Sequence, residues 1–179
     1  MAVKTFGTEA LTSADTNTYL ANSGLVYVKS QTVGSGVSTV TVSSAFSADY
    51  DNYKIVYTGG TATNAVAIQM QLGASATQYY MGLIYVTYAT GTVSTVVSNN
   101  ATAWSHSGEG APNFTTANIE LLNPFLAKYT NMSATYAGTV AGTVAGYHGV
   151  ATSYSSFTFI VGGNTLTGGT ITVYGYRKA

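Results

Sequence analysis

Residues 66–72 read V-A-I-Q-M-Q-L, and this stretch decides the class of fold. Its large apolar side chains recur at every second position between alanine and glutamine, which is the pattern of a β-strand with one buried face. The next apolar stretch, residues 79–88, reads Y-Y-M-G-L-I-Y-V-T-Y and offers apolar groups to both faces. We therefore expect residues 79–88 to lie deep in a sheet or at an interface.

Segments on both sides of this pair continue the period of two, with β-branched and aromatic residues between Gly, Ser, Asn and Asp. Further strands are expected at residues 37–42, 53–57, 93–97, 119–122, 128–136, 157–161 and 170–176. Many short strands without a strand–helix–strand rhythm predict an all-β protein, an antiparallel β-sandwich of which a jelly roll is the favoured variant.

The N-terminal segment departs from this pattern. Thr12 and Asp15 form a T-x-x-D variant of the capping box, and Gly24 suits the residue that follows a helix end. These signals predict one short helix over residues 13–22. A helix this short is marginal alone and needs a partner to dock on. We therefore divide the chain into an attachment segment, residues 1–25, and a β-domain, residues 26–179.

A repeat of the sequence A-G-T-V occupies residues 137–146. As a strand, it would place Ala and Thr on one face and Gly and Val on the other, and its small side chains would permit close approach at a subunit contact. As a mobile surface loop, it would reflect the weakness of glycine in strands. The sequence leaves both interpretations open.

Only 7% of the 179 residues are charged, against roughly 25% in ordinary globular proteins, and six basic groups balance six acidic ones. The scattered lysines and arginine provide no basic patch for nucleic acid. The apolar content argues against disorder, and we expect neither an export signal nor membrane insertion. With so little surface charge, we expect the chain to associate with itself.

The sequence offers little catalytic chemistry. Two histidines, His106 and His148, are too few for a histidine-rich metal site, and cysteine is absent. No G-x-S-x-G motif occurs. Asp49 and Asp51 could form a glycosidase-like carboxylate pair if extended, but D-Y-D-N is typical of a turn. We expect no enzyme activity, no cofactor and no metal.

Fifteen tyrosines are the main candidates for recognition, because tyrosine combines a stiff face with a hydroxyl, although most should pair across strands inside the fold. Residues 97–115 are expected to form an exposed binding loop. Its candidate recognition residues are Trp104, His106 and Glu109.

Three segments resemble structural proteins of tailed-bacteriophage particles, including fibre-like, appendage and decoration proteins. They are F-G-x-x-x-L-T-S-A-D-T-N-T-Y-L at residues 6–20, F-x-x-x-Y-D-N-Y-K-I-V at residues 46–56 and G-T-I-x-V-Y-G-Y-R at residues 169–177. The resemblance implies a homotrimer in the virion, made in the bacterial cytoplasm, whose N-terminal segment binds other capsid, tail or neck proteins. Its β-domain would face outward and could meet a host-surface glycan or protein.

Two sets of residues follow from these expectations. The candidate attachment residues are Leu11, Thr12, Asp15, Tyr19 and Leu20. The candidate oligomer contacts are Tyr79, Leu83, Ile84, Tyr85, Val140 and Val144. A capsid decoration (cement) protein is the alternative within the same class, and a carbohydrate-binding lectin-like module or a glycan-cleaving enzyme would be a different class.

Overall fold

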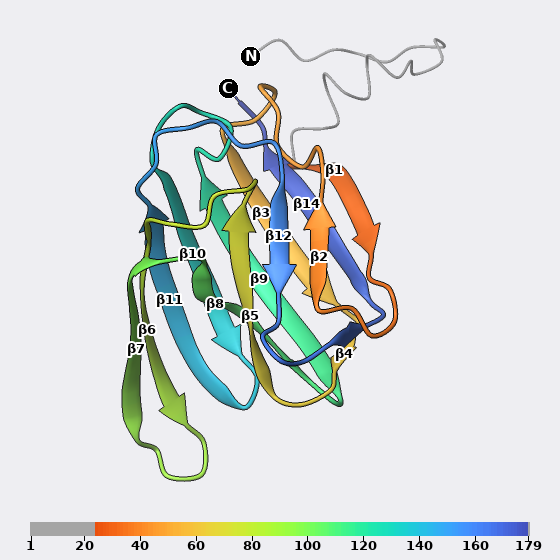
Figure 1. Cartoon of the computed structure of the whole chain (residues 1–179), viewed down its shortest axis with the longest axis vertical. Coiled ribbons are helices and arrows are strands. Elements are labelled where there is room, and N and C mark those ends of the chain that lie inside the picture. The colour runs from red at the N-terminus through yellow and green to blue at the C-terminus, as the bar shows by residue number, and fades with distance from the viewer. Residues whose placement is uncertain (1–23, 179) are drawn as a thin grey trace, which may run out of the picture.

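The computed structural model describes residues 24–178, and the regular elements among them are all β-strands (Figure 1). In chain order the strands are β1 (Leu25–Thr32), β2 (Thr39–Val42), β3 (Asn52–Thr58), β4 (Thr61–Ala62), β5 (Val66–Leu72), β6 (Tyr79–Thr87), β7 (Val93–Ala101), β8 (Trp104–Ala111), β9 (Phe114–Leu122), β10 (Thr130–Ala137), β11 (Val140–His148), β12 (Phe157–Ile160), β13 (Leu166–Thr167) and β14 (Thr170–Tyr176). The helix expected over residues 13–22 and the five attachment residues lie outside the described residues.

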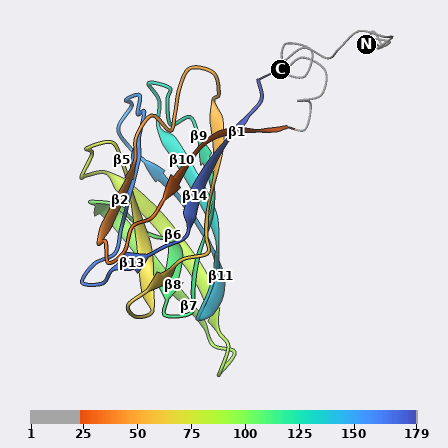
Figure 2. The ribbon, with the colours of Figure 1, turned by 90° about the vertical axis from the view of Figure 1, so that its right-hand side faces the viewer.

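The strands form two facing layers in which every pairing is antiparallel (Figures 1 and 2). The large layer runs β1-β14-β3-β9-β10-β11-β6-β7, and the small layer runs β2-β12-β5-β8. The β8–β9 hairpin connects the layers, because β8 pairs with β5 and with the start of β9. The short strands β4 and β13 pair with each other.

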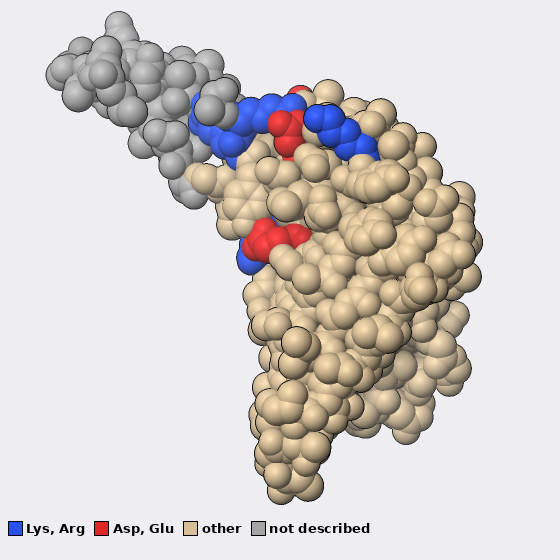
Figure 3. All heavy atoms as spheres, turned by 90° about the vertical axis from the view of Figure 1, so that its left-hand side faces the viewer, with Lys and Arg blue, Asp and Glu red and all other residues tan. Residues whose placement is uncertain are grey.

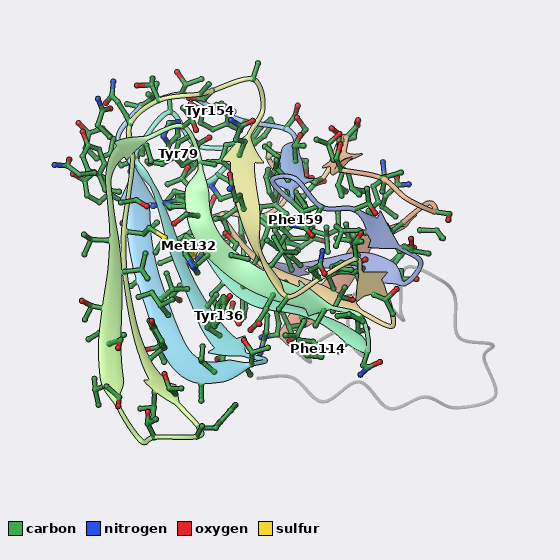
Figure 4. The ribbon with its side chains drawn as sticks, turned by 60° about the horizontal axis from the view of Figure 1, so that its bottom comes forward. Tyr79, Phe114, Met132, Tyr136, Tyr154 and Phe159 are labelled. Carbon is green, nitrogen blue, oxygen red and sulfur yellow. The ribbon has the colours of Figure 1, made fainter. Side chains whose placement is uncertain are left out.

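The core lies between the layers, and the alternation of apolar side chains places it there. In β5, Ile68, Met70 and Leu72 are buried, as the pattern of residues 66–72 predicts. The large layer supplies Tyr79, Met132 and Tyr136, the neighbouring strand β12 supplies Phe159, and Figure 4 shows these four side chains in the interior. Fully burying one large apolar side chain contributes about 1.5–3 kcal/mol, so this shared core is the main source of stability.

The apolar side chains of strand β6 lie on two faces, one buried in the core and one exposed. Leu83 is 1% exposed and packs in the core, whereas its neighbour Ile84 is 59% exposed on the outer side. Residues 79–88 therefore lie in a sheet as expected, but within one chain only the inner face is covered. The outer face of the large layer, meaning the side away from the small layer, is open along β6 and β7.

The repeat at residues 137–146 forms a hairpin and not a mobile loop: Ala137 ends β10, residues 138–139 make the turn, and residues 140–146 belong to β11. Residues 140–148 form β11, whose Ala and Thr side chains point outward while Val144 is buried. Gly142 and Gly146 face inward against β6, where a β-carbon on either glycine would collide with the backbone oxygens of Ile84 and Tyr80. The glycines thus permit close packing of two strands within the chain.

Candidate functional site

Residues 97–115 were expected to form an exposed loop, and this expectation is wrong. Residues 104–111 are strand β8, in which the Trp104 side chain is fully buried and Glu109 is almost fully buried. Trp104 packs edge-on against Tyr79 and donates its indole N–H to the Tyr147 carbonyl oxygen at 3.3 Å. Trp104 and Glu109 therefore present no recognition surface, and His106 is only partly accessible.

Glu109 is the buried carboxylate of this strand, and the turn between β10 and β11 provides its hydrogen-bond donors. Its carboxylate accepts hydrogen bonds from the backbone N–H of Thr139, at 3.0 Å, and from the Thr139 hydroxyl. Gly138 makes room for it, because a β-carbon there would overlap the carboxylate. Since an unpaired buried charge is costly, Glu109 fixes the turn between β10 and β11 to β8. Its role in the chain is structural.

The two histidines belong to separate buried clusters. His106 accepts or donates a hydrogen bond with the Ser105 hydroxyl through Nδ1, and its ring lies 5.6 Å from that of Tyr136. Burial lowers the pKa of His106, while the negative charge of Glu109 partly opposes the shift. Burial and then the Glu109 charge raise the pKa of Tyr136.

His148 stacks on Tyr79 at 4.2 Å and forms a 2.8 Å hydrogen bond with the Tyr154 hydroxyl through Nε2. Burial lowers the pKa of His148, and a hydrogen bond with the Gln78 carbonyl partly opposes this effect. Both of its ring nitrogens are thus committed to the fold.

The carboxylates near residue 50 also have local partners. Asp49 lies in a turn and its carboxylate accepts a 2.9 Å bond from the Ser47 hydroxyl, while Asp51 forms a 2.8 Å ion pair with Lys178. Residues 24–178 contain no group of three or more His, Asp or Glu side chains arranged to hold a metal ion. In the same range, no helix is long and apolar enough to cross a membrane.

The six candidate oligomer contacts divide by face. Tyr79, Leu83 and Val144 are buried in the core and cannot touch another chain without unfolding, which corrects their assignment. Tyr85 and Val140 are partly buried against the same core. Ile84 alone among the six is largely exposed. The period of two explains the division, because the expected contacts were drawn from both faces of β6 and β11.

A groove of about 520 Å³ crosses the outer face of the large layer. Its floor follows successive cross-strand partners, Ser133 on β10, Ala145 on β11 and Gly82 on β6. Small side chains leave the sheet uncovered there, and a β-carbon on Gly82 would meet no atom within 4 Å. A second hollow of about 390 Å³ shares Gly82 and Ala145 and continues the groove to Val97 on β7. Both hollows are shallow and open to solvent along the outer face of the sheet.

One side of the groove is bounded by stacked tyrosine rings. Tyr80 and Tyr147 stack at 4.7 Å, and Tyr129 stacks on Tyr147 at 6.0 Å. The other side carries Ile84, and the β3 end holds an ion pair between Lys54 and Glu120 with an N–O distance of 2.7 Å.

The ionic end of the groove is tied into the sheet. Glu120 also accepts a hydrogen bond from the Tyr176 hydroxyl. Burial, together with this bond and the Glu120 charge, raises the pKa of Tyr176 to about 12. The hydroxyls of Ser133, Thr135 and Thr143 also line the groove, and none has a hydrogen-bond partner among residues 24–178. The groove is therefore neutral overall and rich in free hydroxyls.

Charged residues are absent from long parts of the chain that build the outer face of the large layer. Residues 55–108 and 129–176 contain no Asp, Glu, Lys or Arg. Figure 3 shows the charged side chains gathered toward one end of the molecule, while the opposite end, formed by the tip of β6–β7, carries none. A strongly charged partner would find no complementary field there.

Sequence patterns did not locate this groove, although a signal was present. Small residues stand at outward positions of three neighbouring strands, but only the strand order aligns Ser133, Ala145 and Gly82 in one row. Comparisons with protein-family models, curated proteins and solved structures find no match to this chain.

Proposed function

We propose that this protein is a non-catalytic structural component of a tailed-phage particle, of the trimeric fibre or tail-appendage type. The observation that carries the proposal is the open outer face of β6 and β7, where Ile84, Val86, Val93 and Val97 are exposed on a charge-free surface. Apolar patches of more than about 400 Å² are a liability on a free monomer, so a permanent assembly is the setting that suits such a face.

We infer that the two layers form a jelly-roll-like β-sandwich. Supporting this, the chain alternates between layers, from β2 to β3, from β5 to β6, from β8 to β9 and from β12 to β14. In the small layer, the order β2-β12-β5-β8 places the first and a late strand side by side, as Greek-key connections do.

Mass spectrometry of purified virions tests the proposal directly. The protein should be found in virions made in the bacterial host, and imaging of the particle should place it on a tail, fibre or neck. A location spread over the capsid shell would favour the decoration protein instead. Its absence from virions would contradict both.

Attachment to the particle is proposed to reside in residues 1–25, through Leu11, Thr12, Asp15, Tyr19 and Leu20. Deleting residues 1–23 should leave a folded β-domain, with the far-ultraviolet circular dichroism of a β-protein, that no longer joins particles. Normal incorporation of the truncated protein would place the attachment elsewhere.

A second candidate function, a lectin-like module, is favoured by the stacked Tyr129, Tyr147 and Tyr80 beside the free hydroxyls of the groove. Such a module would bind host-surface glycans without being part of a particle. Binding to a glycan array with no trace of the protein in virions would select it. Release of reducing ends from host glycans, lost in Asp49→Ala or Asp51→Ala, would instead indicate an enzyme.

A further inference from the structure

The β6–β7 hairpin extends beyond the rest of the molecule, and its outermost part, residues 86–93, is here named the arm (Figures 1 and 2). Internal hydrogen bonds hold its turn, from the N–H of Thr87 to the Thr92 oxygen at 3.0 Å and from the N–H of Gly91 to the Thr87 oxygen at 2.8 Å. Gly91 supplies the positive φ of 65° that the turn requires. The arm is thus an ordered projection.

The arm carries apolar side chains that nothing in residues 24–178 covers. Tyr88 is 62% exposed and Val93 is 64% exposed, while Val86 is 37% exposed. No charged residue lies within residues 55–108, so the arm has none of the lysines that commonly protect exposed hairpins from association. An apolar projection of this kind gains free energy when another surface removes it from water.

The arm cannot fill the groove of its own chain. Gly82 on the groove floor and Thr87 at the end of β6 are five residues apart in one extended strand. This separation is about 17 Å along the strand. The arm of a chain therefore leaves the groove floor of that same chain open.

The groove has the properties that the arm needs in a binding site. Its floor of Ala145 and Gly82 leaves room for side chains, and Ile84 and Val97 supply apolar contacts at its β6–β7 end. The free hydroxyls of Ser133 and Thr143 can hydrogen-bond a phenol or a backbone group. Arm and groove are both uncharged apart from the paired Lys54 and Glu120, so their contact leaves no buried charge without a partner.

We propose that the arm of one copy inserts into the groove of the next copy, with Tyr88 lying over Gly82 and Ala145. A contact between two different surfaces of identical chains is heterologous, and it closes into a ring when the rotation between copies is a whole fraction of a turn. The inference deepens the proposed virion function and takes the number three from it, whereas the contact itself rests on the arm and the groove. A second copy fits best because the chain carries both halves of the contact.

One substitution in the arm and one in the groove test this contact separately. The wild-type protein should elute with a mass near three times 18.5 kDa in size-exclusion chromatography with light scattering. Tyr88→Ala removes the inserted ring, and Gly82→Tyr fills the groove at a position whose β-carbon is unobstructed. Both variants should fall to the single-chain mass while keeping the circular dichroism of the wild type. Tyr27→Ala is the matched control, since Tyr27 is 60% exposed on the opposite edge strand, and it should keep the wild-type mass.

Engineered disulfides identify the surfaces directly, because the natural chain has no cysteine. Ala89→Cys places a thiol at the arm tip and Ser133→Cys places one in the groove, and the two lie too far apart in one chain to be bridged. On oxidation, the double variant should form disulfides between chains. Each single variant should run as one chain on a non-reducing denaturing gel.

A wild-type mass of 18.5 kDa, unchanged masses in both Tyr88→Ala and Gly82→Tyr, or an oligomeric double variant without inter-chain disulfides would overturn the arm–groove contact. The virion proposal fails by a different result, the absence of the protein from particles. A ring formed through the arm in a protein missing from virions would support the contact and reject the proposed function.

Discussion

At the scale of single residues, buried polar groups tie distant strands together. His148 connects β11 to Tyr154 and to the Gln78 carbonyl, and Glu109 connects β8 to Thr139. Neither role was visible in the sequence, where Glu109 looked like a loop residue between two glycines and His148 had no recognisable partner. The burial of a glutamate in β8 depends on a turn 30 residues away, and no local pattern reports that partner.

The histidines make stability depend on pH. Because burial lowers the pKa of His148 and of His106 below the ordinary value near 6.5, the unfolded chain binds more protons than the folded chain in mildly acidic solution. Their neutral forms therefore contribute fully above about pH 6.5, and the free energy of unfolding should fall as the pH drops below it. Each histidine adds a slope of up to about 1.4 kcal/mol per pH unit.

Urea denaturation between pH 7 and pH 5 measures this slope. His148→Gln should lower stability at pH 7 and flatten the slope, while His106→Gln should remove the other contribution. A free energy of unfolding that is constant from pH 7 to pH 5 in the wild type would contradict the buried neutral state of both rings.

Two glycines on adjacent strands predict opposite effects of the same substitution. Gly146→Ala would drive a β-carbon against the Tyr80 oxygen and Met81, at a cost of about 1–3 kcal/mol. Gly82→Ala meets open space and replaces a flexible residue in a strand, so it should be neutral or stabilise by up to about 1 kcal/mol. Thermal unfolding of the pair, followed by circular dichroism, checks the difference. Equal destabilisation by both would show that the strand spacing is set by something other than these contacts.

At the scale of elements, period two was a good guide to where strands lie. Each of the nine stretches expected as strands overlaps a strand in the structure, and residues 66–72 and 170–176 match theirs from end to end. The expected stretches did not include β1 or the two-residue strands β4 and β13. They also missed β8, whose W-S-H-S-G-E-G-A is polar and glycine-rich, because small and hydrogen-bonded residues are buried there without an apolar alternation. The pattern also could not decide whether the glycine-containing repeat in β11 forms a strand or a loop. Glycine suits a strand at these positions because β6 packs closely against them, and the sequence does not reveal that neighbour.

A lysine placed on either face of β6 tests whether the inner face serves folding and the outer face serves association. Leu83→Lys buries an unpaired charge in the core and should cost about 4 kcal/mol or more, enough to unfold a marginally stable domain. Ile84→Lys lies on the exposed face and should change the free energy of unfolding by only about 0.5 kcal/mol while abolishing association. Denaturation and light scattering on both variants separate the outcomes. If Ile84→Lys also unfolds the chain, the outer face of β6 is part of the folded core.

At the scale of the whole molecule, the sequence indicated the class of fold and the shortage of charge, but not the shape of the surface. The groove and the arm arise from strand order and from the length of one hairpin, which composition does not encode. Self-association was expected from the composition, and the structure supplies a specific pair of surfaces through which it can be tested.

The wide spacing of lysine and arginine along the chain also determines where trypsin can cut the protein. Trypsin cleaves after Lys and Arg, and neither occurs between Lys54 and Lys128 or between Lys128 and Arg177. Lys54 lies inside β3, whereas Lys128 is exposed between β9 and β10. Apart from trimming at the exposed Arg177 and Lys178, limited trypsin treatment should therefore cut the β-domain first after Lys128. Gel electrophoresis under denaturing conditions would show this cut, and Lys128→Gln should remove it. The two fragments would remain joined by the β9–β10 pairing, so the nicked β-domain should keep its fold in a trypsin-rich environment.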